Sequence, residues 1–587
     1  MKKQIFLATT AREDFWDFSK KIIFLGKWCL RYSKKDIWQP LNGSVLDDPL
    51  VDNGGLEGAR KVVVKTYDKL SSIMTETLNV LHGVDYDERY WKIVVGPWLL
   101  FYISTLYDRY LCVRVAVNKY PKLCTILLDE QSFYVSEDTY DFVCQTREDE
   151  YNLQLFTKIF TVLGKKFVTK KIEKTKNDVD GHNFKVNFKY FIKDVYNFLV
   201  GRSFGRDALI FVSPYFSIKV CLKFFLKSRG KIITMLPQIF KWPVVNLDVG
   251  SRKQIENLVK YAENEFERVL FEMIPFEIPK VFVENYSFVT SFSNRYFPSY
   301  PKALLTANAW YFNAAFKFWA AEQSERKTQL IGIQYGGGYG MSAYMELEDF
   351  ELSILDKYFS WGWSGQNKAK IIPAFINKTQ GVKLLGADNN KKGILWSCGA
   401  TPRFRNSFLD ISCGFSNYLN WRILCYKNLS ASVIEDTIVR LHIADWGWDF
   451  KRMFADMMPD VKVEQEGNCS FYDSLKRCRL YVCDHFTTTY LEALALNKPT
   501  ILFWDPCKIC CRVGVDNDFD ELRKVGILYD TPESAANAVN EVYEDVESWW
   551  NDLKLQKARK TFCDKHARMT SCFIDSWMNE FQKLLKL

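Results

Sequence analysis

Short apolar runs alternate with amphipathic stretches along the first part of the chain. An apolar run at 3–10 has the length of a strand, and the polar loop after it leads into aromatic and basic sequence of helical character. Similar runs lie at 208–212, 231–235 and 330–334, and the stretch 252–272 has nearly helical apolar spacing. Alternation of this kind favours a parallel sheet covered by helices.

A second series of strands and helices begins after the polar turn at 389–392. Its predicted strands are 393–397, part of 433–440, 480–483 and 499–503. A strongly helical segment then runs from residue 531 to the last residue.

The length of the chain requires more than one core. Its 587 residues exceed the roughly 250–300 residues at which single hydrophobic cores stop growing. We therefore predict an N-terminal α/β domain with insertions at 1–390, a Rossmann-like domain at 391–533 and a C-terminal helical segment at 534–587.

Three segments interrupt the alternation. The stretch 36–58 is rich in Gly, Asp, Asn and Pro, so we expect a long loop or an insertion there. The polar, lysine-rich region 148–185 is expected to be a surface helix or a mobile excursion. The apolar stretch 93–107 is shorter than the roughly 18–20 residues that span a bilayer, so no transmembrane helix is predicted.

Composition and charge narrow the class of protein. A hydrophobic fraction of 48% and a charged fraction of 25% are typical of a globular protein, while the aromatic fraction of 16% is high. The net charge of +9 is spread along the chain without a long basic block, so nucleic acid is not expected as a partner. An anionic membrane surface or an anionic substrate fits this charge equally well.

The N-terminal apolar run is too brief for a signal peptide, which predicts a cytoplasmic protein whose 16 cysteines are reduced thiols. Cys507, Cys510 and Cys511 contain one CxxC pair, but the spacing of the other cysteines is irregular. We therefore expect small core residues there and no metal.

The most informative segment runs from Asp484 to Pro506, where a polar loop follows a predicted strand and precedes a helix. Ligands of open α/β sheets bind at the carboxyl ends of the strands, and helix N-termini attract phosphate. We therefore expect the segment to hold a nucleotide through the hydroxyls of Thr487, Thr488 and Thr489 and through Glu492, which is placed to bond a ribose. The alternative is that Thr489 and Glu492 form a capping box, which needs no ligand.

Cationic residues follow two other strands of the second series. Arg440 and His442 occupy alternate positions after a strand and are predicted to face a phosphate or a carboxylate together. Arg403, after the first strand of this series, is a candidate for the same reason. The alternative for each arginine is an ion pair with a neighbouring acid.

A glycine-rich loop follows the strand at 330–334 and precedes an acidic stretch. Consecutive glycines let the backbone approach a ligand, and successive amides can form an anion-binding nest, although a tight turn also explains them. The position between the two halves places the loop where the cleft of a two-domain enzyme lies. The candidate residues are Gln334, Tyr335, Gly336, Gly337, Gly338, Glu348 and Glu351.

Two carboxylates follow the first predicted strand. Glu13 and Asp14 are expected at the edge of the first domain that faces the second, where either could act as general base on an acceptor hydroxyl. The alternative is a helix N-terminus that favours acidic residues because of its dipole.

The chain resembles a family of transferases encoded with bacterial O-antigen and other surface-polysaccharide genes, which is distantly similar to capsule transferases that use cytidine-activated sugars. The resemblance is carried by ATTAREDFW, ERYWKIVVGPWLLFYISTLYDRY, IGIQYGGGYG, LEDFELSILDKYFSWGW, VRLHIADWGW, DHFTTTYLEALALNKPTILFW and EDVESWWNDLKLQKARKTFC, which span nearly the whole chain. Two positions depart from the family pattern, because Tyr335 and Phe350 stand where histidines are expected.

The resemblance implies a GT-B-like fold, in which two Rossmann-like domains face a cleft and the C-terminal helix crosses back over both. It also implies a glycosyltransferase that moves a sugar from a nucleotide-activated donor to a glycan or lipid-linked glycan acceptor. A donor linked to cytidine monophosphate, carrying a keto-sugar acid, is favoured slightly over a uridine or guanosine diphosphate sugar. Positive groups would stabilise the leaving phosphate, so neither a metal nor another cofactor is expected.

Two other functions remain open on the sequence. An epimerase acting on a nucleotide sugar would use the same fold, and the Tyr335 substitution leaves room for a catalytically inactive scaffold of a polysaccharide assembly complex. A cytoplasmic location is expected in each case, and the positive charge leaves room for peripheral association with the inner membrane.

Overall fold

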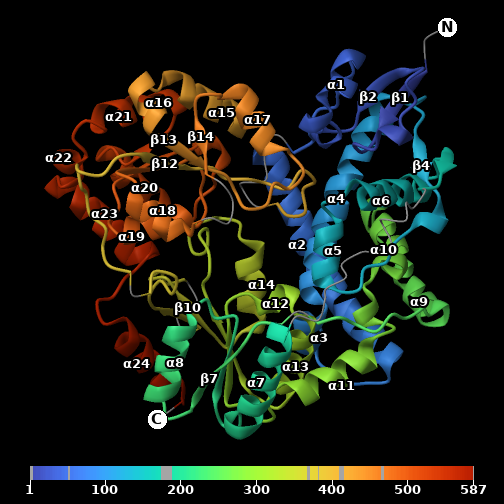
Figure 1. The fold of residues 1–587 in the computed structure, drawn as a ribbon. Helices are drawn as coiled ribbons and strands as arrows, with labels where there is room; N and C mark the ends of the chain where they lie inside the picture. The colour runs from blue at the N-terminus through green and yellow to red at the C-terminus, as the bar shows by residue number, and fades with distance from the viewer. Residues whose placement is uncertain are drawn as a thin grey trace.

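Two parallel six-stranded sheets organise the computed structural model of the chain, which describes residues 4–50, 53–172, 188–238, 240–365, 370–380, 382–408, 415–464 and 469–585. Figure 1 shows each sheet with its covering helices, the first in the lower part of the view and the second at the upper left. The predicted fold class, two Rossmann-like α/β units, is confirmed.

The first sheet has the strand order β7-β6-β8-β9-β10-β11, and all of its strands are parallel. The chain enters at β6, moves to the edge strand β7 and returns past β6 to β8, so the order reverses between β6 and β8. Most of these strands are short runs of buried apolar residues, as expected for a sheet covered on both faces. They are β6 (Leu209–Val212), β7 (Ile232–Met235), β8 (Ala303–Thr306), β9 (Gln329–Ile333), β10 (Lys357–Ser360) and β11 (Ile371–Pro373).

Helices cover both faces of this sheet. The predicted helix at 252–272 is interrupted, because Asn264 caps a new helix at Glu265 by accepting a hydrogen bond from the Glu267 amide at 2.9 Å. The helices of this part are α7 (Phe188–Phe204), α8 (Ile218–Lys227), α9 (Val249–Ile255), α10 (Glu265–Glu277), α11 (Tyr286–Tyr296), α12 (Ala309–Phe312), α13 (Ala314–Glu325) and α14 (Glu346–Ile354).

The second sheet has the strand order β14-β13-β12-β15-β16-β17 and is also parallel throughout. Its chain starts at the middle strand β12, runs outward to β14 and returns to β15 on the other side, which is the strand order of dinucleotide-binding folds. The order therefore reverses between β12 and β15. The strands are β12 (Ile394–Ser397), β13 (Thr437–Arg440), β14 (Lys462–Val463), β15 (Leu480–Cys483), β16 (Thr500–Phe503) and β17 (Leu528–Tyr529).

Two apolar clusters flank the second sheet. Leu395 and Tyr481 face one cluster, and Trp396 and Val482 face the other, because successive strand residues point to opposite faces. The helices of this unit are α15 (Phe415–Asn428), α16 (Ala431–Asp436), α17 (Phe450–Met457), α18 (Phe471–Arg477), α19 (Thr489–Ala495), α20 (Val515–Lys524) and α21 (Pro532–Val542).

The N-terminal region forms a layer of its own. The strands β1 (Ile5–Ala8), β2 (Lys21–Phe24) and β3 (Ser44–Val45) make a separate three-stranded parallel sheet. The expectation that the first strand opens the sheet of the first domain is therefore wrong, because that sheet starts at β6. The other elements are α1 (Lys35–Trp38), α2 (Asn53–His82), α3 (Glu88–Val94), α4 (Gly96–Lys119), β4 (Ile126–Leu128), α5 (Thr139–Gln145), α6 (Asp149–Val162) and β5 (Val168–Lys170).

Two predicted loop or surface segments are corrected. The stretch 36–58 contains part of α1, β3 and the start of α2, a helix of 30 residues. Leu56, Ala59 and Val63 of α2 are buried at helical spacing, and this burial outweighs the glycines of the first turn. Within 148–185, α6 is largely buried and not a surface helix, while residues 173–187 lie outside the described part of the chain.

The C-terminal helices connect the two units, as predicted. The helix α23 (Leu553–His566) packs against α19 and α20 of the second unit. The last helix, α24 (Phe573–Leu585), returns to the first sheet, where the Phe581 ring lies 5.1 Å from Phe211 and 5.3 Å from Phe224. The short helix α22 (Val546–Trp550) precedes them. Among the described residues, no helix is long and apolar enough to cross a membrane.

Candidate functional site

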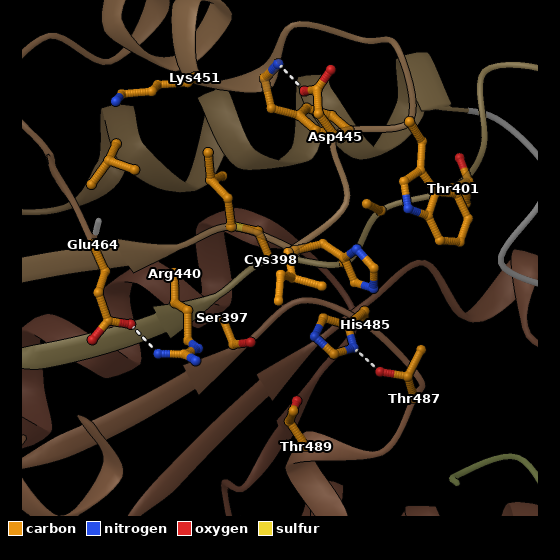
Figure 2. Close-up of a pocket in the computed structure, with 18 of the residues that line it drawn as sticks. Ser397, Cys398, Thr401, Arg440, Asp445, Lys451, Glu464, His485, Thr487 and Thr489 are labelled. Carbon is orange, nitrogen blue, oxygen red and sulfur yellow. Dashed lines mark hydrogen bonds and ion pairs between the residues drawn. The ribbon is translucent and has the colours of Figure 1, made fainter. Parts of the chain in front are cut away.

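A cavity of about 1470 Å³ lies at the carboxyl edge of the second sheet. It is lined by the residues that follow β12, β13 and β15, by Glu464 after β14 and by the first turns of α17. Figure 2 shows these side chains pointing into a common space above the strand ends. The cavity spans the point between β12 and β15 where the strand order reverses, which is the usual ligand site of such sheets.

A buried ion pair fixes the two loops at this point. Asp484, the residue after β15, accepts hydrogen bonds from Arg422 of α15 at 2.7 and 3.1 Å. Its carboxylate also accepts from the Gly399 amide at 3.0 Å and from the Trp396 indole at 3.2 Å. Burial alone would raise the pKa of Asp484, but the Arg422 charge and its hydrogen bonds lower it on balance. The loops after β12 and β15 are therefore held in one geometry.

His485 presents a neutral imidazole to the cavity. The side chain is buried, and burial is the main reason that its pKa falls to about 4. Its Nδ1 lies 2.5 Å from the Thr487 hydroxyl, and within the described ranges Nε2 has no hydrogen-bond partner. Gly399 makes room for this ring, since a Cβ there would lie 2.7 Å from the His485 Cβ. No sequence pattern singled out His485, although it follows a strand that was predicted.

The three threonines of the loop, which were predicted to bind a nucleotide, line the cavity, but each also has a protein partner. The Thr488 hydroxyl accepts from the Gly337 amide at 3.0 Å, and the Thr489 hydroxyl accepts from Tyr481 at 2.8 Å. The helix α19 begins at Thr489 without a side-chain cap, so the capping-box alternative is wrong. Because α19 has only seven residues, its helix dipole is small.

Glu492 does not reach the cavity. It lies on α19, is buried, and pairs with Lys378 at 3.6 Å. Burial is the main reason that the pKa of Glu492 is raised, since the nearby Lys378 opposes it only in part. The predicted bond from Glu492 to a ribose is therefore not supported.

Arg440 and His442, which were predicted to face a phosphate or a carboxylate together, both line the cavity. The Arg440 guanidinium forms an ion pair with Glu464, which Figure 2 shows, and donates to Ser474 at 3.3 Å. The alternative predicted for Arg440, an ion pair with a neighbouring acid, is therefore observed, and Glu464 compensates much of its charge. The His442 ring lies edge-on to Trp446, with 5.2 Å between ring centroids.

Arg403 is directed away from the cavity, which corrects its predicted role. Its guanidinium makes a two-pronged ion pair with Asp149 of α6 and donates to the Trp28 carbonyl. The pair is buried and joins the second unit to the N-terminal layer. Arg403 is therefore a structural link and not a phosphate ligand.

Lys451 is a cavity cation that no sequence pattern indicated. It is exposed near the start of α17, and Figure 2 places it above the strand ends. In the described ranges Lys451 has no ion-pair partner. Its charge is therefore available to an anionic ligand in a way that the charges of Arg440 and Arg403 are not.

The segment 444–449 forms one wall of the cavity and is fixed by contacts with the N-terminal layer. Trp446 and Asp449 have φ values of 57° and 61°, which ordinary residues rarely adopt. The Asp449 carboxylate accepts from the Ser33 amide at 2.9 Å and from its hydroxyl at 2.7 Å, and the Arg147 guanidinium lies 4.9 Å from the Trp446 ring. The N-terminal layer thus stabilises a strained segment of the cavity.

The glycine-rich loop lies between the two units, as expected, but it contacts the threonine loop and does not line the cavity. A Cβ on Gly337 would lie 2.1 Å from the Thr487 carbonyl oxygen, and a Cβ on Gly336 would lie 3.3 Å from Thr488. The Gly340 amide donates to Glu348 at 2.7 Å, and Gly338 has a φ of +88°. The amides of Gly337 and Gly340 bind protein groups, so the predicted anion nest is not formed by them.

Gln334 is a buried support for this loop. Its side-chain oxygen accepts from the Trp361 amide and the Trp363 indole, both at 2.8 Å, and its amide group donates to the Gly336 carbonyl at 2.9 Å. These bonds use the polar atoms of the side chain inside the protein. Gln334 therefore positions the loop and does not face a ligand.

A cluster of tyrosines surrounds Glu351 at the carboxyl edge of the first sheet. The Glu351 carboxyl group accepts from Tyr311 at 2.5 Å and from Tyr339 at 3.2 Å. It is fully buried, and burial raises its pKa to about 8. Tyr335 stacks on Tyr215 with 5.9 Å between centroids. Glu348 pairs with Arg512 at 2.8 Å.

Glu13 and Asp14 do not lie where the sequence placed them. Both belong to a short 3-10 helix after β1 in the small separate sheet, and neither lines the cavity. Glu13 pairs with Lys34 at 2.5 Å and Asp14 with Arg12 at 2.8 Å. Both charges are compensated, so their predicted role as general base is not supported. Among the described residues, no three or more His, Cys, Asp or Glu side chains form a group that could hold a metal ion.

Known proteins resemble the chain in sequence and in structure. A family model described as LIC12162 family transferase matches residues 5–581. The solved structure of spinosyn rhamnosyltransferase SpnG is similar at 10% identity over 65% of this chain and 100% of that chain, with a TM-score of 0.33. The wall teichoic acid polymerase TagF is similar at 11% identity over 69% of this chain and 98% of that chain, with a TM-score of 0.32. No curated protein matches the chain.

Proposed function

Because the chain belongs to the LIC12162 transferase family, we propose that it is a glycosyltransferase that takes a sugar from a nucleotide-activated donor. The expected family of transferases is confirmed by this match. The observation that carries the proposal is the cavity at the strand-order reversal between β12 and β15, with His485 and Lys451 on its walls. The acceptor is a surface-polysaccharide or O-antigen glycan, free or lipid-linked, at the cytoplasmic face of the inner membrane.

The cavity supports binding of a donor phosphate. Lys451 supplies a positive charge without an ion-pair partner in the described ranges. When the Thr487 hydroxyl donates to Nδ1 of His485, the neutral ring carries its proton on Nε2 and can donate it to a phosphate oxygen. Both contacts strengthen as the phosphate gains charge on leaving, which lowers the barrier to transfer.

The small number of uncompensated cations favours a donor with one phosphate. Arg440 pairs with Glu464, so the other cations that line the cavity are Lys451 and Arg452, whose guanidinium donates to the Ser33 carbonyl at 3.1 Å. We therefore favour a cytidine-monophosphate-linked keto-sugar acid over a uridine or guanosine diphosphate sugar. In the transfer, the acceptor hydroxyl oxygen bonds to the anomeric carbon, the bond from that carbon to the phosphate oxygen breaks, and the phosphate leaves with the electron pair. The hydroxyl proton passes to a base or to solvent.

The acceptor belongs on the first unit. Tyr215 and Tyr335 stack at the carboxyl edge of the first sheet, and Asn308 donates to the Tyr215 hydroxyl at 3.0 Å. These groups follow β6, β9 and β8, so they flank the reversal of strand order in that sheet. The Tyr215 ring is exposed while Tyr335 is partly buried beside it, so Tyr215 offers an aromatic face that suits a sugar ring.

A nucleotide panel tests the proposal. Thermal denaturation of the full chain with cytidine monophosphate, uridine diphosphate and guanosine diphosphate should show stabilisation that grows with ligand concentration and is largest for the cytidine nucleotide. A response to none of the three would overturn the proposal. Sugar release from the donor only when a glycan acceptor is present identifies a transferase, whereas interconversion of the donor sugar without an acceptor identifies an epimerase.

A further inference from the structure

The helix α8 carries an apolar stripe and a lysine stripe side by side on its outer surface. Ile218, Leu222 and Leu226 recur every four residues and are 75%, 56% and 65% exposed. On the opposite side of the helix, Cys221 and Phe224 are buried against the first sheet. The helix therefore has two apolar faces, of which only one is covered by the protein. The lysines of the second stripe are Lys219, Lys223 and Lys227.

The C-terminal end of α7 lies against α8. Leu199 and Phe204 are 57% and 47% exposed, and the Arg202 guanidinium lies 4.7 Å from the ring of the exposed Phe198. The Phe204 ring meets Phe225 of α8 with 5.5 Å between centroids. Both helices also pack on the edge strand β7, and Figure 1 shows them on either side of it. We refer to Ile218, Leu222, Leu226 and Phe204, with Lys219 and Lys223, as the α7–α8 surface.

Charge decides which occupant fits this surface. Lys227 pairs with Asp575 of α24, but Lys219, Lys223, Arg229 and Lys231 are exposed around the apolar stripe. Apolar side chains flanked by lysines match the boundary of an anionic bilayer, where the apolar groups enter the acyl region and the ammonium groups meet lipid phosphates. Aligned stripes of this kind differ from the single scattered apolar residues that are normal on protein surfaces.

We propose that the α7–α8 surface docks the protein on an anionic phospholipid membrane. The inference rests on the proposed membrane-bound acceptor, to which it adds the site of attachment. Because α8 has only ten residues, the contact is shallow and reversible. The helix starts three residues after Tyr215, and the Ser217 amide donates to Gln380 at 2.7 Å. One end of the docking helix therefore lies beside the acceptor edge, so a lipid-linked glycan in the same membrane can reach it.

Vesicle flotation of the full chain tests this inference. The chain should float with vesicles of phosphatidylglycerol and phosphatidylcholine, should stay in solution with phosphatidylcholine alone, and should be released by salt. Leu222→Ser with Leu226→Ser should lower binding to the anionic vesicles at least tenfold. Lys219→Glu with Lys223→Glu should lower it by a similar factor, since each lysine near an anionic surface contributes about fivefold.

Matched control variants lie elsewhere on the protein. Leu553→Ser removes another exposed apolar side chain, and Lys557→Glu with Lys560→Glu removes two exposed lysines of α23, so both should float like the unchanged protein. Absence of flotation with anionic vesicles, or full flotation of both α8 variants, would overturn the inference. So would a concentration-dependent dimer that the Leu222 and Leu226 changes abolish, because a second copy would then be the occupant. Nucleotide binding in solution should be the same in all of these variants as in the unchanged protein. If the unchanged protein bound no nucleotide, the transferase proposal would be contradicted and the docking inference would not be.

Discussion

Asp484 and Arg422 form a buried two-bond ion pair beneath the cavity, with both side chains at most 2% exposed. Asp484 is the first residue after β15, and Arg422 reaches it from α15 over a separation of 62 residues. The same carboxylate holds the Gly399 amide at 3.0 Å. One pair therefore controls how the loops after β12 and β15 face each other, and hence the shape of the candidate donor site.

Loss of one partner should destabilise the protein strongly. Arg422→Ala leaves a buried carboxylate without its counter-charge, so we expect the free energy of unfolding to fall by about 3–5 kcal/mol in urea titrations. Arg523→Ala breaks two surface pairs, with Asp520 and Asp530, and should cost about 1 kcal/mol or less. Equal effects of the two changes would show that the buried pair does not organise the second unit.

Lys451 should contribute more to nucleotide affinity than the arginine that the sequence favoured. Lys451→Ala removes a positive charge that has no ion-pair partner among the described residues. We therefore expect the dissociation constant of the nucleotide that binds most tightly to rise about tenfold, as measured by calorimetry. Arg440→Gln combined with Glu464→Gln removes an ion pair without changing the net charge and should alter affinity less than about threefold. Lys476→Ala, on α18 outside the cavity, serves as the matched control. If the combined Arg440 and Glu464 changes weakened nucleotide binding more than Lys451→Ala, Arg440 and not Lys451 would be the phosphate contact.

Local pattern identified β12, β13, β15 and β16 of the second sheet because each is a short, largely apolar run, whereas the two-residue edge strands β14 and β17 were not predicted. The loop at 484–488 was predicted for the same reason, since it lies between β15 and α19. The sequence also showed that β1 is a strand, but strand pairing is non-local. Its partner is β2 and not the six-stranded sheet, which moved Glu13 and Asp14 away from the expected cleft.

The partners of charged residues were the main source of error in the site. Arg403 pairs with Asp149, 254 residues earlier in the chain, so no spacing rule could reveal that its charge is compensated. Lys451 and His485 carry no motif, and only the fold shows that both face the cavity. A polar residue directly after a buried strand was the one available signal for His485.

The stability of the first unit should decrease as the pH rises through the neutral range. Glu351 has a pKa of about 8 in the folded protein because it is buried, and about 4.5 when unfolded, so folding favours its protonated form. Its contribution is fully present below pH 4.5 and is lost as the pH approaches 8, by up to about 4 kcal/mol. Glu351→Gln keeps an acceptor for Tyr311 and should reduce the slope of unfolding free energy between pH 5 and pH 8.5, leaving the smaller loss from Glu346, whose pKa burial raises to about 7. An unchanged curve would show that Glu351 is already ionised in the folded protein.

The contact between the glycine-rich loop and the threonine loop should tolerate no side chain at Gly337. A Cβ there would lie 2.1 Å from the Thr487 carbonyl oxygen, a backbone atom that cannot rotate away, so Gly337→Ala must push the two units apart. We expect a loss of about 2 kcal/mol or more of unfolding free energy, together with weaker nucleotide binding because Thr487 also holds His485. Gly58→Ala is the matched control, since its Cβ would meet nothing within 4 Å on α2 and the change should raise stability by about 0.4–1 kcal/mol. If Gly337→Ala left both unfolding and nucleotide binding unchanged, the loops would have to separate freely, and the geometry of the donor site would not depend on the first unit.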